Sequence, residues 1–201
     1  MLLSFTMQKV RIFIAVSLPE EIHKNLSMIS DQLKRSIGNG VVRWVKPANI
    51  HLTLRFLGEI PAGDIAQLKT SLEEPVAQHE VFPMLVQQVG VFPNIHKPRV
   101  IWAGLKESNA LLALYNTVET VMRELGYDSE ERPFSAHLTL GRISQTASLQ
   151  QTIHCGEVVS KCAVGELGSF IVKSVDIYLS ELTAGGSIYT RLHTLSLKKE
   201  S

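Results

Sequence analysis

The hydrophobic pattern of the chain changes its period several times, which predicts a mixture of strands and helices. Runs rich in β-branched and aromatic residues, typical of strands, lie at residues 10–18, 41–45, 50–57, 82–91, 99–105, 132–143, 170–179 and 187–197. Apolar spacing and helix start and stop signals predict helices at residues 19–37, 61–78, 108–125 and 147–159, with Gly156 interrupting the last. The strands come in runs between helices rather than in strict alternation with them, which favours an α+β fold with mostly antiparallel sheets.

The bulk composition limits the classes of protein to consider. With 201 residues, of which 45% are apolar and 19% charged, the chain is typical of one ordinary globular domain, which we place at residues 7–198. A net charge of +1 does not indicate a protein that holds duplex nucleic acid through many phosphate contacts. Any contact with nucleic acid is therefore expected to be local.

The cysteines and the N-terminus indicate a compartment. Cys155 and Cys162 are too few for a disulfide framework and lack the spacing of a zinc site, so we expect reduced thiols. The apolar run at the N-terminus is too short for a membrane span, and Lys9 and Arg11 follow it. We therefore expect a cytoplasmic protein without a signal peptide or a transmembrane helix.

The string His-Leu-Thr-Leu occurs twice, starting at His51 and at His137, within the predicted strands 50–57 and 132–143. Successive side chains of a strand point to opposite faces, so each copy presents a histidine and a threonine on one face. The threonines are Thr53 and Thr139. Two identical copies in β-favouring surroundings indicate a duplicated element.

Two such strands facing one another suit chemistry at phosphorus. One neutral imidazole can take a proton from an entering oxygen while the other, protonated, gives one to the leaving oxygen, because the unperturbed imidazole pKa is near ~6.5. The hydroxyl groups of the threonines can donate to phosphoryl oxygens. This scheme needs neither a metal nor a nucleotide cofactor.

Two other interpretations of these histidines exist. A single histidine on a half-buried strand is usually structural, but a packing requirement would not ask for the same four residues twice. A metal site needs three or four convergent donors, and the nearest carboxylate, Glu59, lies eight residues after His51. We therefore expect no metal site.

Longer stretches around both motifs resemble a known family. Residues 42–59 (VRWVKPANIHLTLRFLGE) and 134–142 (FSAHLTLGR) are similar to the 2′-5′ RNA ligase or RNA 2′,3′-cyclic phosphodiesterase family of the two-histidine (2H) phosphoesterase superfamily. The likeness also includes residues 11–16, 90–93, 98–102 and 180–189. It implies a bilobal α+β fold, with two mostly antiparallel sheets, outer helices and pseudo-two-fold symmetry around a central cleft for an RNA terminus.

The resemblance also implies roles for single residues. His51 and His137 correspond to the catalytic pair, Thr53 and Thr139 to phosphate-binding hydroxyls, and Arg142 to an arginine that assists phosphate binding. The implied reaction is hydrolysis of an RNA 2′,3′-cyclic phosphate to a 2′-phosphate without a cofactor, with 2′-5′ joining of tRNA halves as a second activity. We expect a monomer. Two aromatic residues that flank the motifs, which could stack on a base or belong to the core, are Phe56 and Phe134.

Two alternatives to this function stay open at the level of sequence. One is a phosphodiesterase that acts on small cyclic nucleotides or on 2′-5′ oligoadenylate, which the same residues would serve. The other is a module that binds RNA or nucleotides without turnover. The presence of all four histidines and threonines of the motifs argues against the binding module.

Overall fold

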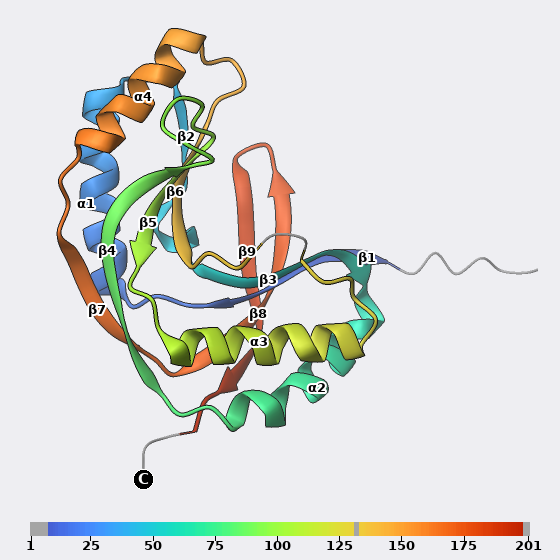
Figure 1. Cartoon of the computed structure of the whole chain (residues 1–201). Coiled ribbons are helices and arrows are strands. Elements are labelled where there is room, and N and C mark those ends of the chain that lie inside the picture. Colours follow the sequence, from blue (N-terminus) through green and yellow to red (C-terminus); the bar gives the residue numbers. More distant parts are fainter. Residues whose placement is uncertain (1–7, 131–132, 199–201) are drawn as a thin grey trace, which may run out of the picture.

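An antiparallel sheet runs through the molecule from one side to the other (Figure 1). The computed structural model describes residues 8–130 and 133–198, and nine strands of this part form one sheet in the order β7-β4-β5-β6-β3-β1-β8-β9, with β2 paired to β6. The strands are β1 (Lys9–Val16), β2 (Val42–Trp44), β3 (Leu52–Pro61), β4 (Phe82–Phe92), β5 (Val100–Leu105), β6 (His137–Ile143), β7 (Glu166–Val172), β8 (Ser174–Thr183) and β9 (Gly186–Ser196).

The described residues also form four α-helices and two 3-10 turns. They are α1 (Glu20–Ile37), α2 (Ile65–Ala77), α3 (Asn109–Glu124), α4 (Leu149–Lys161), η1 (Pro47–Asn49) and η2 (Ala62–Asp64). The predicted α+β class and the antiparallel pairing are therefore confirmed. None of the helices in this part of the chain is both long and apolar enough to cross a membrane.

The sheet consists of two related halves. We call β3-β1-β8-β9 the first-motif half and β7-β4-β5-β6, with β2, the second-motif half. In each half the motif strand pairs with the strand that precedes it across a helix: β3 pairs with β1 across α1, and β6 pairs with β5 across α3. This correspondence is the pseudo-two-fold relation expected of the fold.

The two halves meet where the motif strands begin. Strand β3 is joined to β6 through the pair Leu52 and Leu138, each of which directly follows a motif histidine. The expectation of two separate sheets is corrected by this pairing, because it makes the halves one continuous sheet. The histidines are consequently brought to the centre of the molecule.

The helices cover the halves from outside, and two of them cross over. Helix α1 leaves β1 in the first-motif half but packs on β7 and on α4, and α4 covers β4. Helix α3 leaves β5 in the second-motif half but packs on β3 and on α2, while α2 lies against β9. Each half is therefore covered by a pair of helices, as Figure 1 shows.

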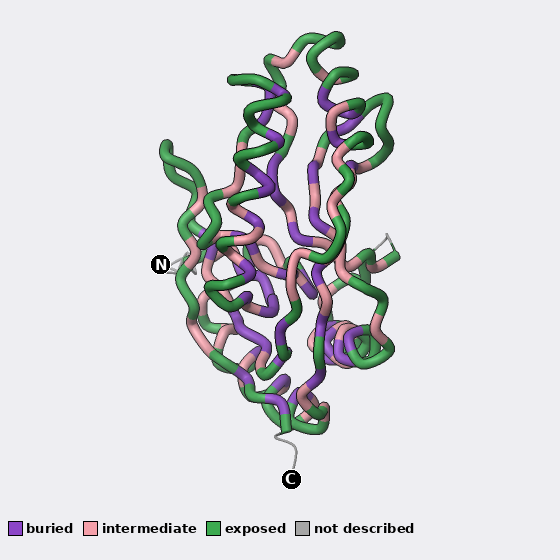
Figure 2. The backbone as a smooth tube through the Cα atoms, turned by 90° about the vertical axis from the view of Figure 1, so that its left-hand side faces the viewer, coloured by how far each residue is buried: buried purple, intermediate pink, exposed green. Residues whose placement is uncertain are grey.

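The helix sequences account for this packing. In α1 the buried positions recur at helical spacing, and Figure 2 shows buried and exposed segments alternating along the helices; the buried residues of α1 are Ile22, Leu26, Ile29, Ser30, Leu33 and Ile37. Helix α4 forms in spite of Gly156, because Ser148 and Gln151 make a capping box at its start. A Cβ atom at Gly156 would lie 1.9 Å from the carbonyl oxygen of Ile95, so the glycine permits close packing of the loop between β4 and β5 on α4.

Three strand boundaries differ from the prediction. The single strand expected at 170–179 is wrong, since β7 ends at Val172 and β8 starts at Ser174. The break is required because β7 pairs with β4 and β8 pairs with β1, on opposite sides of the molecule. The first motif strand spans 52–61 and the second begins at 137, while the predicted starts of the domain and of the second strand, Met7 and Arg132, lie outside the described residues.

Candidate active site

A bulge in each motif strand decides which side chains face the centre. In the pairing of β3 with β1 the register skips Leu54, and in the pairing of β6 with β5 it skips Leu140. A bulge reverses the alternation of faces beyond it. As a result Phe56 and Arg142, rather than the residues directly before them, share the side of Thr53 and Thr139.

The two motif histidines have the same tautomer, set by the same local contact. Nδ1 of His51 lies 2.9 Å from the carbonyl oxygen of Asn49, and Nδ1 of His137 lies 2.7 Å from that of Ser135. A carbonyl oxygen can only accept, so Nδ1 donates in both rings and Nε2 is left for a substrate. Each partner is the residue two positions earlier, which repeats the duplication at the level of hydrogen bonds.

His51 is enclosed by aromatic rings. The ring of Phe13 stacks on it at a centroid distance of 4.6 Å, and Tyr189 meets it edge-on at 5.3 Å. Burial lowers the pKa of His51 to about 4, although the hydrogen bond to the backbone of Asn49 acts in the opposite direction. The ring is therefore neutral in the free protein at pH 7.

His137 lies in a different setting. Its ring forms a T-shaped pair with Phe92 at a centroid distance of 5.1 Å, with the two planes 88° apart. Its hydrogen bond to Ser135 is exposed, whereas the bond of His51 to Asn49 is partly buried. The two imidazoles are thus oriented by the same kind of backbone hydrogen bond but lie in different environments.

The cleft between the halves consists of two adjoining hollows. The His51 hollow, of about 420 Å³, is lined by residues of both halves, among them Arg11, Phe13, Asn49, His51, Thr53, Phe56, Thr139, Arg142 and Tyr189. The His137 hollow, of about 570 Å³, is lined by residues that include Thr53, Phe56, Phe92, Tyr115, Glu130, Phe134, Ser135 and His137. Thr53 and Phe56 line both hollows, so the two adjoin at these residues.

The structure therefore brings all seven residues singled out from the sequence to this cleft. Phe56 is 43% exposed and lies at the junction of the hollows. Phe134 lines the His137 hollow but stacks one face on Tyr115, at a centroid distance of 4.0 Å. Only the rest of the Phe134 ring is available to a base. This residue therefore belongs partly to the core and partly to the cleft, the two interpretations that the sequence left open.

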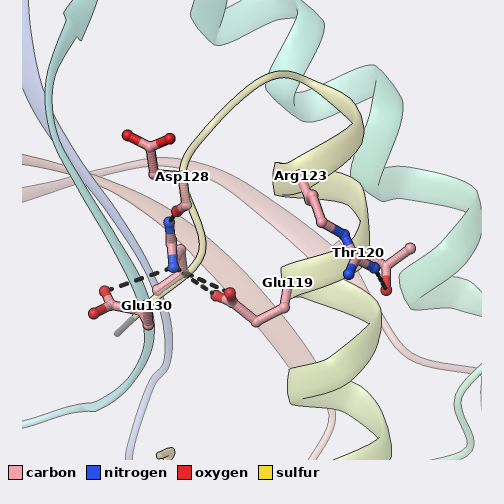
Figure 3. Close-up of polar contacts among 6 residues, drawn as sticks. Glu119, Thr120, Arg123, Asp128 and Glu130 are labelled. Atoms are coloured by element: carbon pink, nitrogen blue, oxygen red, sulfur yellow. Dashed lines mark hydrogen bonds and ion pairs between the residues drawn. The ribbon is translucent and has the colours of Figure 1, made fainter. Parts of the chain in front are cut away.

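A buried arginine ties the first motif strand to the loop before the second. Arg55 is 6% exposed, and its Nη1 lies 3.0 Å from Glu119 on α3 and 3.7 Å from Glu130. Its Nη2 donates to the carbonyl oxygen of Asp128. Figure 3 shows Glu119, Asp128 and Glu130 gathered around the guanidinium group. This cluster fixes the start of the loop that leads to His137.

Sequence reasoning gave no role to several other residues of the cleft. Arg11 is a cation directly before the apolar run 12–16 of β1, which is the local signal that could have drawn attention to it. Asn49 has two functions, since its carbonyl holds His51 and its side chain donates to the carbonyl oxygen of Ser187 at 2.8 Å. Tyr189 comes from β9, and no local pattern connects it to the motifs.

The cleft has a clear chemical character. Two imidazoles, two threonine hydroxyls and the guanidinium groups of Arg11 and Arg142 line it, and the His51 hollow has no carboxylate among its lining residues. Within residues 8–130 and 133–198, no three histidine, cysteine or acidic side chains gather where they could hold a metal ion. Such a set of groups can bind an anion and move protons on either side of it.

Comparisons with known proteins agree with this chemistry. The sequence profile of the LigT-like phosphoesterases matches residues 16–102. The chain is 31% identical to the RNA 2′,3′-cyclic phosphodiesterase of Methanothermobacter thermautotrophicus, over 94% of this chain and 100% of that protein. It is 33% identical to the RNA 2′,3′-cyclic phosphodiesterase of Archaeoglobus fulgidus, over 91% and 98% of the two chains.

Solved structures give the same result. A crystal structure of a protein from Thermus thermophilus superposes with a TM-score of 0.79 at 27% identity, covering 95% of this chain and 100% of that one. Escherichia coli LigT in its apo form superposes with a TM-score of 0.72 at 25% identity, covering 95% and 99%. The similarity to these proteins extends over almost the whole chain.

Proposed function

The chain belongs to the LigT-like, two-histidine phosphoesterase family and is thus an enzyme that acts on phosphate esters. We propose that it hydrolyses the 2′,3′-cyclic phosphate of an RNA end to a 2′-phosphate. The observation that carries the proposal is the pair of imidazoles whose Nδ1 atoms are held by equivalent carbonyls, so that Nε2 of each is free. The names of the relatives support the choice of substrate.

The proposed reaction transfers one proton at each side of phosphorus. Nε2 of one ring accepts a proton from water as the water oxygen bonds to phosphorus. Nε2 of the other ring donates a proton to the 3′ oxygen as its bond to phosphorus breaks. The products are a 3′ hydroxyl and a 2′-phosphate, and a proton exchange between the rings and water restores the starting state.

A bound phosphate also changes the protonation of His51. Its pKa of about 4 in the free protein reflects burial. An anionic cyclic phosphate beside the ring favours the protonated form and raises that pKa. Substrate binding therefore favours uptake of a proton by His51, and the reaction needs one protonated ring.

Three residues are assigned to the phosphoryl oxygens. Thr53 and Thr139 donate hydroxyl hydrogen bonds from the two motif strands, and Arg142 reaches the same hollow because of the bulge at Leu140. Their contribution is greatest when negative charge builds on these oxygens. Each motif thus supplies one proton carrier and one threonine hydroxyl, and the second motif strand adds Arg142.

The aromatic residues of the cleft are assigned to the base. Phe56 is partly exposed at the junction of the hollows, and Phe134 adds a face beside it, supported from behind by Tyr115. Stacking on aromatic rings is how single-stranded RNA is commonly held. A nucleotide at an RNA end fits this combination of phosphate donors and rings.

The same steps extend to 2′-5′ ligation. When the 5′ hydroxyl of a second RNA, such as a tRNA half, takes the place of water, the same proton transfers join the two through a 2′-5′ linkage. We further propose that the protein acts as a monomer in the cytoplasm. One chain supplies both motifs of the cleft, and its cysteines, Cys155 and Cys162, are free thiols.

The test uses an oligoribonucleotide with a terminal 2′,3′-cyclic phosphate, in the presence of a chelator and without ATP. The expected product carries a 2′-phosphate, identified by its mobility against 2′- and 3′-phosphate standards. Activity that appears only when a metal is added back would overturn the mechanism. Turnover of 2′-5′ oligoadenylate or small cyclic nucleotides but not of the RNA would select the alternative substrate class.

A further inference from the structure

One cation of the cleft has no part in the proposed reaction. The His51 hollow holds the guanidinium groups of Arg11, from β1, and Arg142, from β6. A cyclic phosphate carries a single negative charge, which the histidines, the threonines and Arg142 already address. Arg11 therefore adds a positive charge beyond what the reacting phosphate requires.

Arg11 is held in place without being neutralised. Its Cζ atom lies 5.3 Å from the ring centroid of Phe56, within the range of a cation–π contact. Its Nε atom is buried and has no hydrogen-bond partner, and no carboxylate of the described residues lies within 4.0 Å of it. Glu59 is its neighbour across the strand pair, yet the two form no ion pair.

The extra cation is found in one half only. Strand β5, which corresponds to β1 in the second-motif half, consists of Val100–Leu105 and has no charged residue. The cleft is also asymmetric in charge, because both arginines line the His51 hollow, whereas no lysine or arginine of the described residues lines the His137 hollow. Such an asymmetry suits a ligand with a second anionic group on one side of the reacting phosphate.

We propose that Arg11 binds the phosphate on the 5′ side of the terminal nucleotide, so that the enzyme selects RNA ends over nucleoside 2′,3′-cyclic phosphates. This inference rests on the proposed function. In RNA the terminal ribose joins its cyclic phosphate to a 5′ phosphodiester, and a free nucleoside 2′,3′-cyclic phosphate lacks that second group. A guanidinium group engages two phosphate oxygens at once, and Phe56 already orients it.

The test compares adenosine 2′,3′-cyclic phosphate with the same compound carrying a 5′-phosphate. For the wild-type protein we expect kcat/KM to be about 10- to 100-fold higher with the 5′-phosphate, the range of a charge-assisted hydrogen bond. Arg11→Met should bring this ratio close to 1, and Arg11→Lys should keep part of it. The matched control is Arg123→Met on α3, whose side chain contacts Thr120 of its own helix and which should keep the wild-type ratio.

A ratio that Arg11→Met leaves at the wild-type value overturns the inference, and so does a wild-type ratio near 1. If the wild-type protein hydrolyses neither these compounds nor the cyclic-phosphate oligoribonucleotide, the proposed function fails, and binding then decides on Arg11. Calorimetry with adenosine 3′,5′-bisphosphate and adenosine 3′-monophosphate should show tighter binding of the bisphosphate by wild type, about 10- to 100-fold, and a loss of this difference in Arg11→Met. Equal affinities of the wild-type protein for the two nucleotides overturn the inference.

Discussion

The two motif strands share four residues and a bulge, yet the positions that follow differ between them. After the bulge at Leu54 come Arg55 and Phe56, and after the one at Leu140 come glycine and arginine. In each pair the second residue faces the cleft and the first faces away. The repeated part thus sets the geometry, while the residues after it specialise each half.

The residues that face away show how far this specialisation goes. Arg55 is clamped by Glu119 on α3, whereas Gly141 leaves room for β2. A Cβ atom at Gly141 would lie 2.5 Å from Cγ1 of Val42. One half therefore uses this position for an ion pair and the other for close strand packing, so neither residue could replace its counterpart.

The histidines differ in the same manner. His51 is stacked on Phe13 and is shielded from water, which lowers its pKa, while His137 forms only a T-shaped pair with Phe92. Identical sequence strings have therefore produced identical tautomers but unequal surroundings. The predictions below test whether the shared geometry or the unequal surroundings control each property.

The largest expected effect concerns the shared geometry. His51→Ala and His137→Ala should each lower the rate on a cyclic-phosphate oligonucleotide by about 10²–10⁴-fold or more, because each removes one proton transfer. The double variant should be little worse than either single one, since the rings act as a unit. His154→Ala, on the exposed side of α4, is the control that should keep the rate. Near-normal turnover by a folded single variant would break the symmetry of roles.

The next largest effect is expected at Arg55, one of the residues that differ between the two motif strands. Arg55→Met should lower the free energy of unfolding by about 3–5 kcal/mol, because it leaves Glu119 without its buried partner. Urea denaturation measures the loss. Arg142→Met is the control, since that side chain is exposed and should change stability by less than about 0.5 kcal/mol. Equal losses in the two variants would contradict the distinction between the halves.

The pH dependence of stability sharpens the comparison further. The unfolded chain binds a proton at His51 below about pH 6.5, whereas the folded protein resists it until about pH 4. This contribution to stability is complete above pH 6.5 and is lost as the pH falls toward 4, by at most about 3 kcal/mol. His51→Gln should flatten that part of the curve of unfolding free energy against pH. NMR titration of the ring with a midpoint above 6 would refute the enclosure.

The smallest effects belong to the groups that hold oxygens. Thr53→Val and Thr139→Val should each lower kcat/KM by about 10-fold, which corresponds to the loss of one hydrogen bond of about 1–1.5 kcal/mol. The pH values at which the rate rises and falls should stay the same, because the threonines transfer no proton. Arg142→Ala should also lower kcat/KM. Arg142→Lys should recover only part of the loss, because an ammonium group replaces a guanidinium group that can bind two phosphate oxygens at once. A threonine variant whose pH–rate profile rises or falls at a different pH would assign proton transfer to a hydroxyl. An unchanged kcat/KM in Arg142→Ala would remove Arg142 from the site.

Much of this molecule could be predicted from local patterns. The helical spacing of apolar residues and the start and stop signals gave α1, α2 and α3, and the repeated string drew attention to the two histidines. These features depend on residues close together in the chain, where side-chain period and capping chemistry decide the outcome. The resemblance of the flanking residues then supplied the family.

The remaining features depend on backbone geometry and on distant partners. Strict alternation would put Arg55 in the cleft and turn Phe56 away, and only the bulge reverses this arrangement. Arg11 and Tyr189 reach the His51 hollow from β1 and β9, so their roles require the sheet order. The β-favouring pattern at residues 170–179 concealed a strand break for the same reason.

The crossing of α1 and α3 has a consequence for how the chain assembles. Because each of these helices covers the half opposite to the strand before it, neither half can be completed by a continuous segment of the chain. Contacts between residues distant in sequence must form before either core is closed, which gives the fold a high contact order and slows folding. The repeat therefore cannot be separated into two autonomous units by cutting the chain in its middle, and the interlaced helices bind the duplicated parts into a single cooperative body.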